Sequence, residues 1–349
     1  MPLPRWSVLR TCFAFLFLAP AAWSVESMPE IPPPWAYGFK TPPPANFIPA
    51  TAPAAAPAAP VDPTRYGLPG TTRTFTRAEI TSIFNPADYF PEEHATPPSI
   101  VAHGKAPIVW SCARCHNFNG KGRPENAGIA GLPVDYFVAE MQAFRRGERT
   151  SSDPRKPNTK MMVDYARAMS DDEIRAAAEY FGAMPWTSWI RVVETDHVPK
   201  TEVSAGMYLQ TPNGGDEPLA DRIIEVPEIP DAVEIMRSPH VGFVAYVPVG
   251  SVKRGSSLAT TGNAGKTMAC ALCHGADLSG GNIVGFGAVP GIAGRSPSYL
   301  MRQLFDFKSA HRTGSRTILM QPVVANLSPG DMRDIVAYLA SLPVSPKKG

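Results

Sequence analysis

Apolar residues recur at helical spacing in two separate stretches of the chain, which predicts two amphipathic helices. The apolar positions are Phe137, Met141 and Phe144 in one stretch and Leu300, Leu304 and Phe307 in the other. Each stretch follows the tetrapeptide Gly-Ile-Ala-Gly, at 128–131 and again at 291–294. A glycine turn followed by the same helix pattern indicates that one fold occurs twice in the chain.

Helix-start signals mark further helices around these two. Residues 76–79 (Thr-Arg-Ala-Glu) and 170–173 (Ser-Asp-Asp-Glu) have the form of a capping box. Ser328 precedes Pro329, which places an N-cap before a proline at the first helical position. We expect a short opening helix near 76, another at 98–104, and a closing helix in each copy.

The segment between the copies, residues 185–248, has a different pattern. Short β-prone runs at 190–192, 207–209, 222–226 and 243–247 are separated by Gly, Pro and Asn. They predict a small antiparallel sheet. This insert either joins the two copies or provides a docking surface for a partner.

The N-terminal 72 residues contain two segments of unusual composition. Arg5 and Arg10 precede a short apolar run and small residues, which is typical of a secretory signal at 1–24. The run is shorter than the ~20 residues that span a bilayer, so a membrane anchor is the weaker alternative. Residues 25–72 are proline-rich, with 12 prolines between 28 and 63, and predict an extended arm or linker. Its aromatic residues are either incidental or dock on the protein or on a partner; they are Trp35, Tyr37, Phe39 and Phe47.

Length and charge narrow the class of protein. A chain of 349 residues with 44% hydrophobic content is long enough for two domains with ordinary cores. The formal net charge is +2, and removal of Arg5 and Arg10 with the signal leaves acidic and basic groups balanced. This balance argues against a nucleic-acid partner. With the signal removed, we expect no transmembrane span.

Cysteine spacing identifies the chemistry. The motif C-x-x-C-H occurs at Cys112, Cys115 and His116, and again at Cys270, Cys273 and His274. In this motif the two thiols attach a haem covalently and the histidine ligates its iron. A zinc half-site and a thioredoxin-like pair are weaker alternatives, because zinc needs compact ligand pairs and a redox pair has no use for the histidine. The sequence therefore predicts two haems c.

A methionine follows each motif histidine at the same distance, and these are candidates for the other axial position. They are Met162 and Met320, and each precedes the serine N-cap of its closing helix by the same number of residues. That register favours Met162 over its neighbour Met161. A soft thioether suits haem iron, although buried methionines are more often core fillers.

Together these motifs resemble class I cytochrome c of the tandem dihaem type, over residues 76–184 and 249–345. The resemblance implies a mainly α fold of two such domains, with His116 and His274 as proximal ligands. It also implies that Met162 and Met320 are distal ligands carried on loops. With the β-rich insert and the proline-rich arm, this completes the expected organisation.

Two details concern the surroundings of the haems. The family places a proline before the glycine turn, where its carbonyl accepts the N–H of the proximal imidazole; Pro290 fits, but the first copy has Ala127. Because such contacts tune a metal, we expect unequal potentials at the two haems. Arg149 and Arg312 stand at matching positions and are candidates to pair with haem propionates.

Two closed His/Met sites would leave no position for a substrate, which favours an electron carrier over an enzyme. We expect it in the periplasm, exchanging electrons with a periplasmic dehydrogenase or a membrane redox complex. The alternative is a haem enzyme with one open iron position, either a dihaem peroxidase or a small-substrate oxidoreductase such as a sulfur oxyanion dehydrogenase. A third interpretation is a subunit that binds one specific dehydrogenase through the arm and the insert and accepts its electrons. This interpretation is compatible with an electron carrier.

Overall fold

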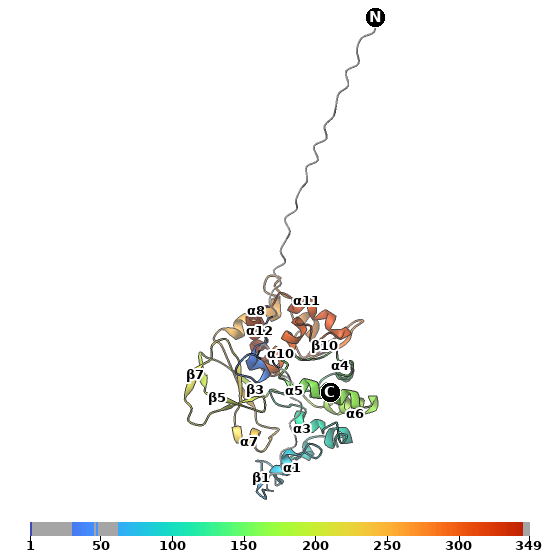
Figure 1. Cartoon of the computed structure of the whole chain (residues 1–349), viewed down its shortest axis with the longest axis vertical. Coiled ribbons are helices and arrows are strands. Elements are labelled where there is room, and N and C mark those ends of the chain that lie inside the picture. Colours follow the sequence, from blue (N-terminus) through green and yellow to red (C-terminus); the bar gives the residue numbers. More distant parts are fainter. Residues whose placement is uncertain (2–29, 45–46, 48–61, 345–349) are drawn as a thin grey trace. The chain divides into compact units, whose positions relative to one another are not determined.

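The computed structural model describes Met1, residues 30–44, Phe47 and residues 62–344 (Figure 1). Except for Met1, the expected signal at 1–24 lies outside these residues, as do residues 25–29, 45–46 and 48–61 of the proline-rich arm. In the part of the chain that is described, no helix is both long enough and apolar enough to cross a membrane.

The first copy of the repeated fold is helical, as predicted (Figure 1, cyan to green). Its elements are α1 (Arg77–Thr81), η2 (Pro91–Glu93), α2 (Ser99–Ala102), α3 (Cys112–His116), α4 (Val134–Arg146), α5 (Pro157–Ala168) and α6 (Asp171–Gly182). The capping box that opens α6 is confirmed, because Ser170 and Glu173 each accept the other's backbone N–H. The apolar stripe of α4 is buried and packs with α6 around Phe181.

The second copy repeats this arrangement with a longer first helix. Its elements are α8 (Ser251–Thr261), α9 (Ala271–His274), β10 (Gly280–Ile283), β11 (Gly287–Pro290), α10 (Pro297–Lys308), η3 (Ser315–Leu319), α11 (Gln321–Val324) and α12 (Pro329–Ser341). Ser328 caps α12 as predicted. The β10–β11 hairpin was not predicted. The counterpart of α8 in the first copy is α2, which has only four residues. Pro97 and Pro98 precede it, and because a proline disfavours helix at the residue before it, α2 cannot extend toward the N-terminus.

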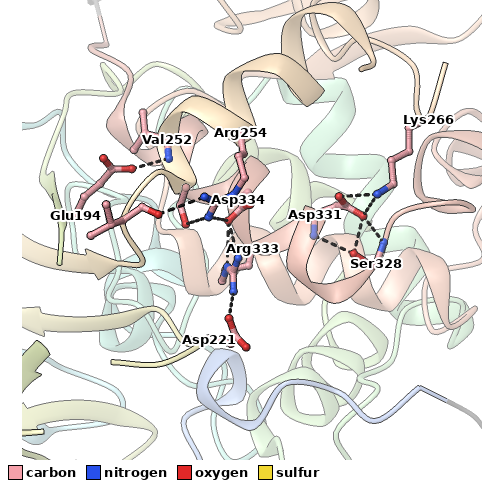
Figure 2. A network of polar contacts seen from close by, with 11 residues as sticks. Glu194, Asp221, Val252, Arg254, Lys266, Ser328, Asp331, Arg333 and Asp334 are labelled. Carbon is pink, nitrogen blue, oxygen red and sulfur yellow. Dashed lines mark hydrogen bonds and ion pairs between the residues drawn. The ribbon is translucent and has the colours of Figure 1, made fainter. Parts of the chain in front are cut away.

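Close packing of α8 against α12 holds the second copy together. A Cβ placed on Gly255 would lie 1.8 Å from the backbone oxygen of Asp334, so only glycine allows this approach. Figure 2 shows the polar contacts beside it. Arg254 donates to the buried carboxylate of Asp334 at 2.6 Å, and Arg333 links the same carboxylate to Asp221 of the insert.

The insert is β-rich as predicted, but its three-stranded sheet is mixed. Its elements are β3 (Ile190–Glu194), β4 (His197–Pro199), β5 (Thr201–Ser204), β6 (Met207–Gln210), β7 (Asp216–Pro218), β8 (Ile224–Pro227), α7 (Pro230–Glu234) and β9 (Phe243–Val247). The pairs β4–β7 and β5–β6 are antiparallel. β8 pairs antiparallel with β9, whereas β3 pairs parallel with β9. The prediction failed there because the chain makes a long crossover between β3 and β9, and local patterns carry no signal for strand direction across such a connection.

Part of the proline-rich arm docks on the protein. Within η1 (Pro34–Tyr37), Trp35 and Tyr37 are buried, and the Tyr37 hydroxyl donates to Asp306 of α10 at 3.0 Å. Arg302 of α10 in turn donates to the carbonyl of Ala36. Farther along, β1 (Arg65–Gly67) pairs with β2 (Thr74–Thr76), so regular structure begins before residue 72, the expected end of the arm.

Two candidate haem sites

Each copy encloses a large cavity lined by its own motif. Cys112, Cys115, His116 and Met162 line the first, with a volume of about 1320 Å³ including the space at its mouth. Four corresponding residues line the second, of about 1690 Å³; they are Cys270, Cys273, His274 and Met320. The predicted thiols and axial ligands are therefore brought together, one set in each cavity.

The proximal histidines are held the same way in both copies. In α3, His116 Nδ1 lies 2.9 Å from the carbonyl oxygen of Ala127, and His274 Nδ1 lies 2.8 Å from that of Pro290. A carbonyl only accepts, so Nδ1 carries the proton and Nε2 keeps its lone pair for a metal. Burial lowers the pKa of both imidazoles, although each carbonyl bond opposes this. Ala127 thus provides the hydrogen bond that the family takes from proline.

The environment of the cysteines fits covalent attachment better than thiol redox chemistry. Burial raises the pKa of Cys112 to about 12 and that of Cys270 to about 11. A thioredoxin-like pair needs the opposite shift, because the thiolate is its nucleophile. In the described part of the chain all four motif cysteines are free of disulfides.

Of the two methionines, Met162 is placed differently from the expectation, whereas Met320 lies at a turn. Met162 lies inside α5 and not on a loop, because Pro157 starts a helix that continues to Ala168. Met320 joins η3 to α11. Met161 also lines the first cavity, but only Met162 packs against the buried core of that copy.

One layer of side chains separates the two cavities. Five residues line both of them: Leu132, Tyr136 and Glu140 from the first copy, and Tyr299 and Gln303 from the second. Arg149 lines only the first cavity and Arg312 only the second. The repeated helices α4 and α10 therefore meet at this common wall.

Sequence reasoning missed several cations in these cavities. Lys156 and Arg302 line the first, and Arg295 and Arg316 line the second. Burial, together with the nearby Arg302, lowers the pKa of Lys156 to about 7. Arg295 donates to the carbonyl of Gly128, so it joins the glycine turns of both copies. None of these residues belongs to a repeated motif, so the duplication gave no signal for them.

Comparison with known proteins identifies the family of the two copies. The family model described as cytochrome c matches residues 101–184 and 252–343, just over half of the chain. A cytochrome c-552 of Acidithiobacillus ferridurans is 32% identical over 238 residues, which are 67% of this chain and 75% of that protein. A solved cytochrome c4 structure from Acidithiobacillus ferrooxidans covers 66% of this chain and 98% of its own, at 23% identity and a TM-score of 0.42.

A further relative is named for its redox role. The "thiosulfate dehydrogenase electron acceptor" of Stutzerimonas stutzeri (strain A1501) is 40% identical over 90 residues, 26% of this chain. The match spans only 39% of that relative. With two matched domains, each presenting a C-x-x-C-H motif at its own cavity, the chain belongs to the cytochrome c family and carries two covalently bound haems c.

Proposed function

We propose that this protein is an electron carrier that passes single electrons through two haems with His/Met ligation. The observation that carries the proposal is that a histidine and a methionine line the same cavity in each copy. A haem held by both has no position left for a substrate, and when bound it supplies one-electron redox chemistry at its iron. The protein's own part is to fix the ligands, exclude water and hold the proximal Nδ1 proton on a carbonyl.

The common wall supports electron exchange between the two sites. Tyr136 and Tyr299 line both cavities, so a group filling one cavity contacts the same side chains as a group filling the other. Electrons accepted in one copy can therefore leave from the second. A carrier with two entry points can connect a donor to an acceptor that dock at different places.

The partner and compartment are part of the proposal. A relative is named as the electron acceptor of a dehydrogenase, which supports a dehydrogenase as the donor here. The sequence pattern of residues 1–24 supports export, and we place the mature protein in the periplasm.

Carbon monoxide tests whether the irons are closed. The reduced holoprotein should give no carbonyl spectrum, because CO needs a free axial position. Met162→Ala and Met320→Ala should each bind CO at one haem, while Met161→Ala serves as the matched control and should behave like the wild type. Rapid CO binding by the wild-type protein would reject the closed-site proposal and favour a haem enzyme.

A further inference from the structure

The common wall holds a set of residues at equivalent positions of the two copies. Counted from the glycine turns, Tyr136 matches Tyr299, and Arg149 matches Arg312. The fourth helical position after each tyrosine breaks the symmetry, because it is Glu140 in the first copy and Gln303 in the second. An acid in one copy therefore faces its neutral isostere in the other.

Both arginines bind both of these side chains. Arg149 donates to Glu140 Oε2 at 2.6 Å and to Gln303 Oε1 at 2.8 Å. Arg312 donates to the same two atoms, at 2.7 Å and 2.9 Å respectively. The backbones of Arg149 and Arg312 also pair as a β-bridge. We call these four residues the bridging cluster; they connect the copies and are mostly shielded from solvent, with side-chain exposures of 12% for Arg149 and 5% for Arg312.

The bridging cluster carries an unbalanced charge. Burial alone would raise the pKa of Glu140, but Arg312 and Arg149 lower it below its ordinary value, so the carboxylate is ionised at neutral pH. Burial raises the pKa of the adjacent Tyr136 to about 12, which keeps it neutral. Two guanidinium groups against one carboxylate leave one positive charge in excess. An uncompensated buried charge is costly, so an anion is expected beside it.

One donor marks where that anion would lie. Arg312 Nε is buried and makes no well-aligned hydrogen bond with the described residues, although the side chain of Tyr136 lies near the guanidinium and helps to raise the pKa of Arg312. Arg312 is 4% exposed and lines the second cavity, where its Nη atoms are already engaged by Glu140 and Gln303. Arg312 Nε is therefore the donor of the bridging cluster that is available to an anion in the second cavity.

We propose that the bridging cluster is the binding site for a propionate of the haem in the second cavity, and that Gln303 keeps the cluster cationic for it. A glutamate at 303 would neutralise the second arginine and place a carboxylate where it repels the propionate. The uncharged amide fills the same space and still accepts from both arginines. This inference rests on covalent haem attachment in that cavity and not on the identity of the electron partner.

Charge at this position acts on the haem potential in a predictable direction. Gln303→Glu adds a negative charge, stabilises the oxidised iron and lowers its midpoint potential. Glu140→Gln removes a negative charge and raises the potential. Because the cluster lines both cavities, both haems respond, with the larger shift at the second. Gln210→Glu on β6 is the matched control, since it makes the same charge change at a residue that lines neither cavity.

The experiment is a redox titration of each holoprotein at constant pH, followed by haem absorbance. We expect opposite shifts for Gln303→Glu and Glu140→Gln, and a small shift for Gln210→Glu. Arg312→Lys keeps the charge but removes the Nε donor, and should lower the potential of the second haem alone. Equal-sign shifts of the two cluster variants, or shifts no larger than the control, would show that the cluster only braces the domains. If Gln303→Glu does not fold, Glu140→Gln and Arg312→Lys still decide between these outcomes.

Discussion

Replacing Gly255 with alanine should loosen the second domain, because no space exists for a side chain there. The added Cβ would lie 1.8 Å from the backbone oxygen of Asp334, whereas real Cβ atoms essentially never come closer than 3.0 Å. The oxygen that the Cβ would contact belongs to the backbone of α12, so no side-chain rotation can relieve the contact. The two helices would have to separate by more than an ångström along a packed interface.

The size of the effect follows from two opposing terms. Alanine is favoured over glycine in a helix interior by about 1 kcal/mol. Overpacking a tight core typically costs about 1–3 kcal/mol and sometimes more, and a rigid backbone contact lies at the upper end. The expected net loss is about 2 kcal/mol, or roughly 8–16 °C in Tm for a domain of about 100 residues.

Thermal or guanidinium unfolding of the holoprotein, followed by circular dichroism, measures this loss. Gly330→Ala in α12 is the matched control, because the nearest atom to its added Cβ would be the Ser328 hydroxyl at 3.7 Å. That variant should be unchanged or more stable by up to about 1 kcal/mol. A Gly255→Ala protein as stable as the wild type would refute the packing argument.

Three further predictions concern the arm, a helix cap and acid stability. Tyr37→Phe leaves the buried Asp306 carboxylate without one of its donors and should cost about 1–2 kcal/mol in chemical denaturation, with little change in the haem spectrum. Ser170→Ala removes the cap of α6 and should cost about 1 kcal/mol, and a Ser170→Asp variant should retain most of the stability if capping is the cause. The pKa of Glu140 is lower in the folded protein than its ordinary value of 4.5, so its ionisation contributes to the free energy of unfolding. This contribution is fully present at pH values above 4.5 and is lost as the pH falls through the folded-state pKa. A pH series of unfolding curves should therefore fall more steeply below 4.5 for the wild type than for Glu140→Gln, and parallel curves would contradict this.

Local signals predicted the parts of the fold that depend on neighbours in the sequence. The caps at Ser170 and Ser328 were correct because a capping box needs only residues three apart. Each C-x-x-C-H motif is local in the same way, because its residues lie within one short helix or at its N-cap. Fold class followed from repeating these local units.

Features that depend on distant contacts were not predictable in this way. The parallel pairing of β3 with β9 depends on how the chain crosses the insert. The helix around Met162 was missed because the family resemblance placed the ligand on a loop. Arg149 and Arg312 were predicted as a matched pair. Their shared hydrogen bonds to Glu140 and Gln303 form only when the two copies pack together, so no local sequence signal indicates them.

The docked arm imposes an order on assembly. Tyr37 stands near the beginning of the chain, and its hydrogen-bond partner Asp306 follows 269 positions later. A chain made from its N-terminus cannot close this contact until α10 has been synthesised, and the long loop makes closure a late event. Both C-x-x-C-H motifs precede α10, so their thiols are available to the haem-attachment machinery before the arm is fastened. Haem attachment can thus precede the final closure of the protein.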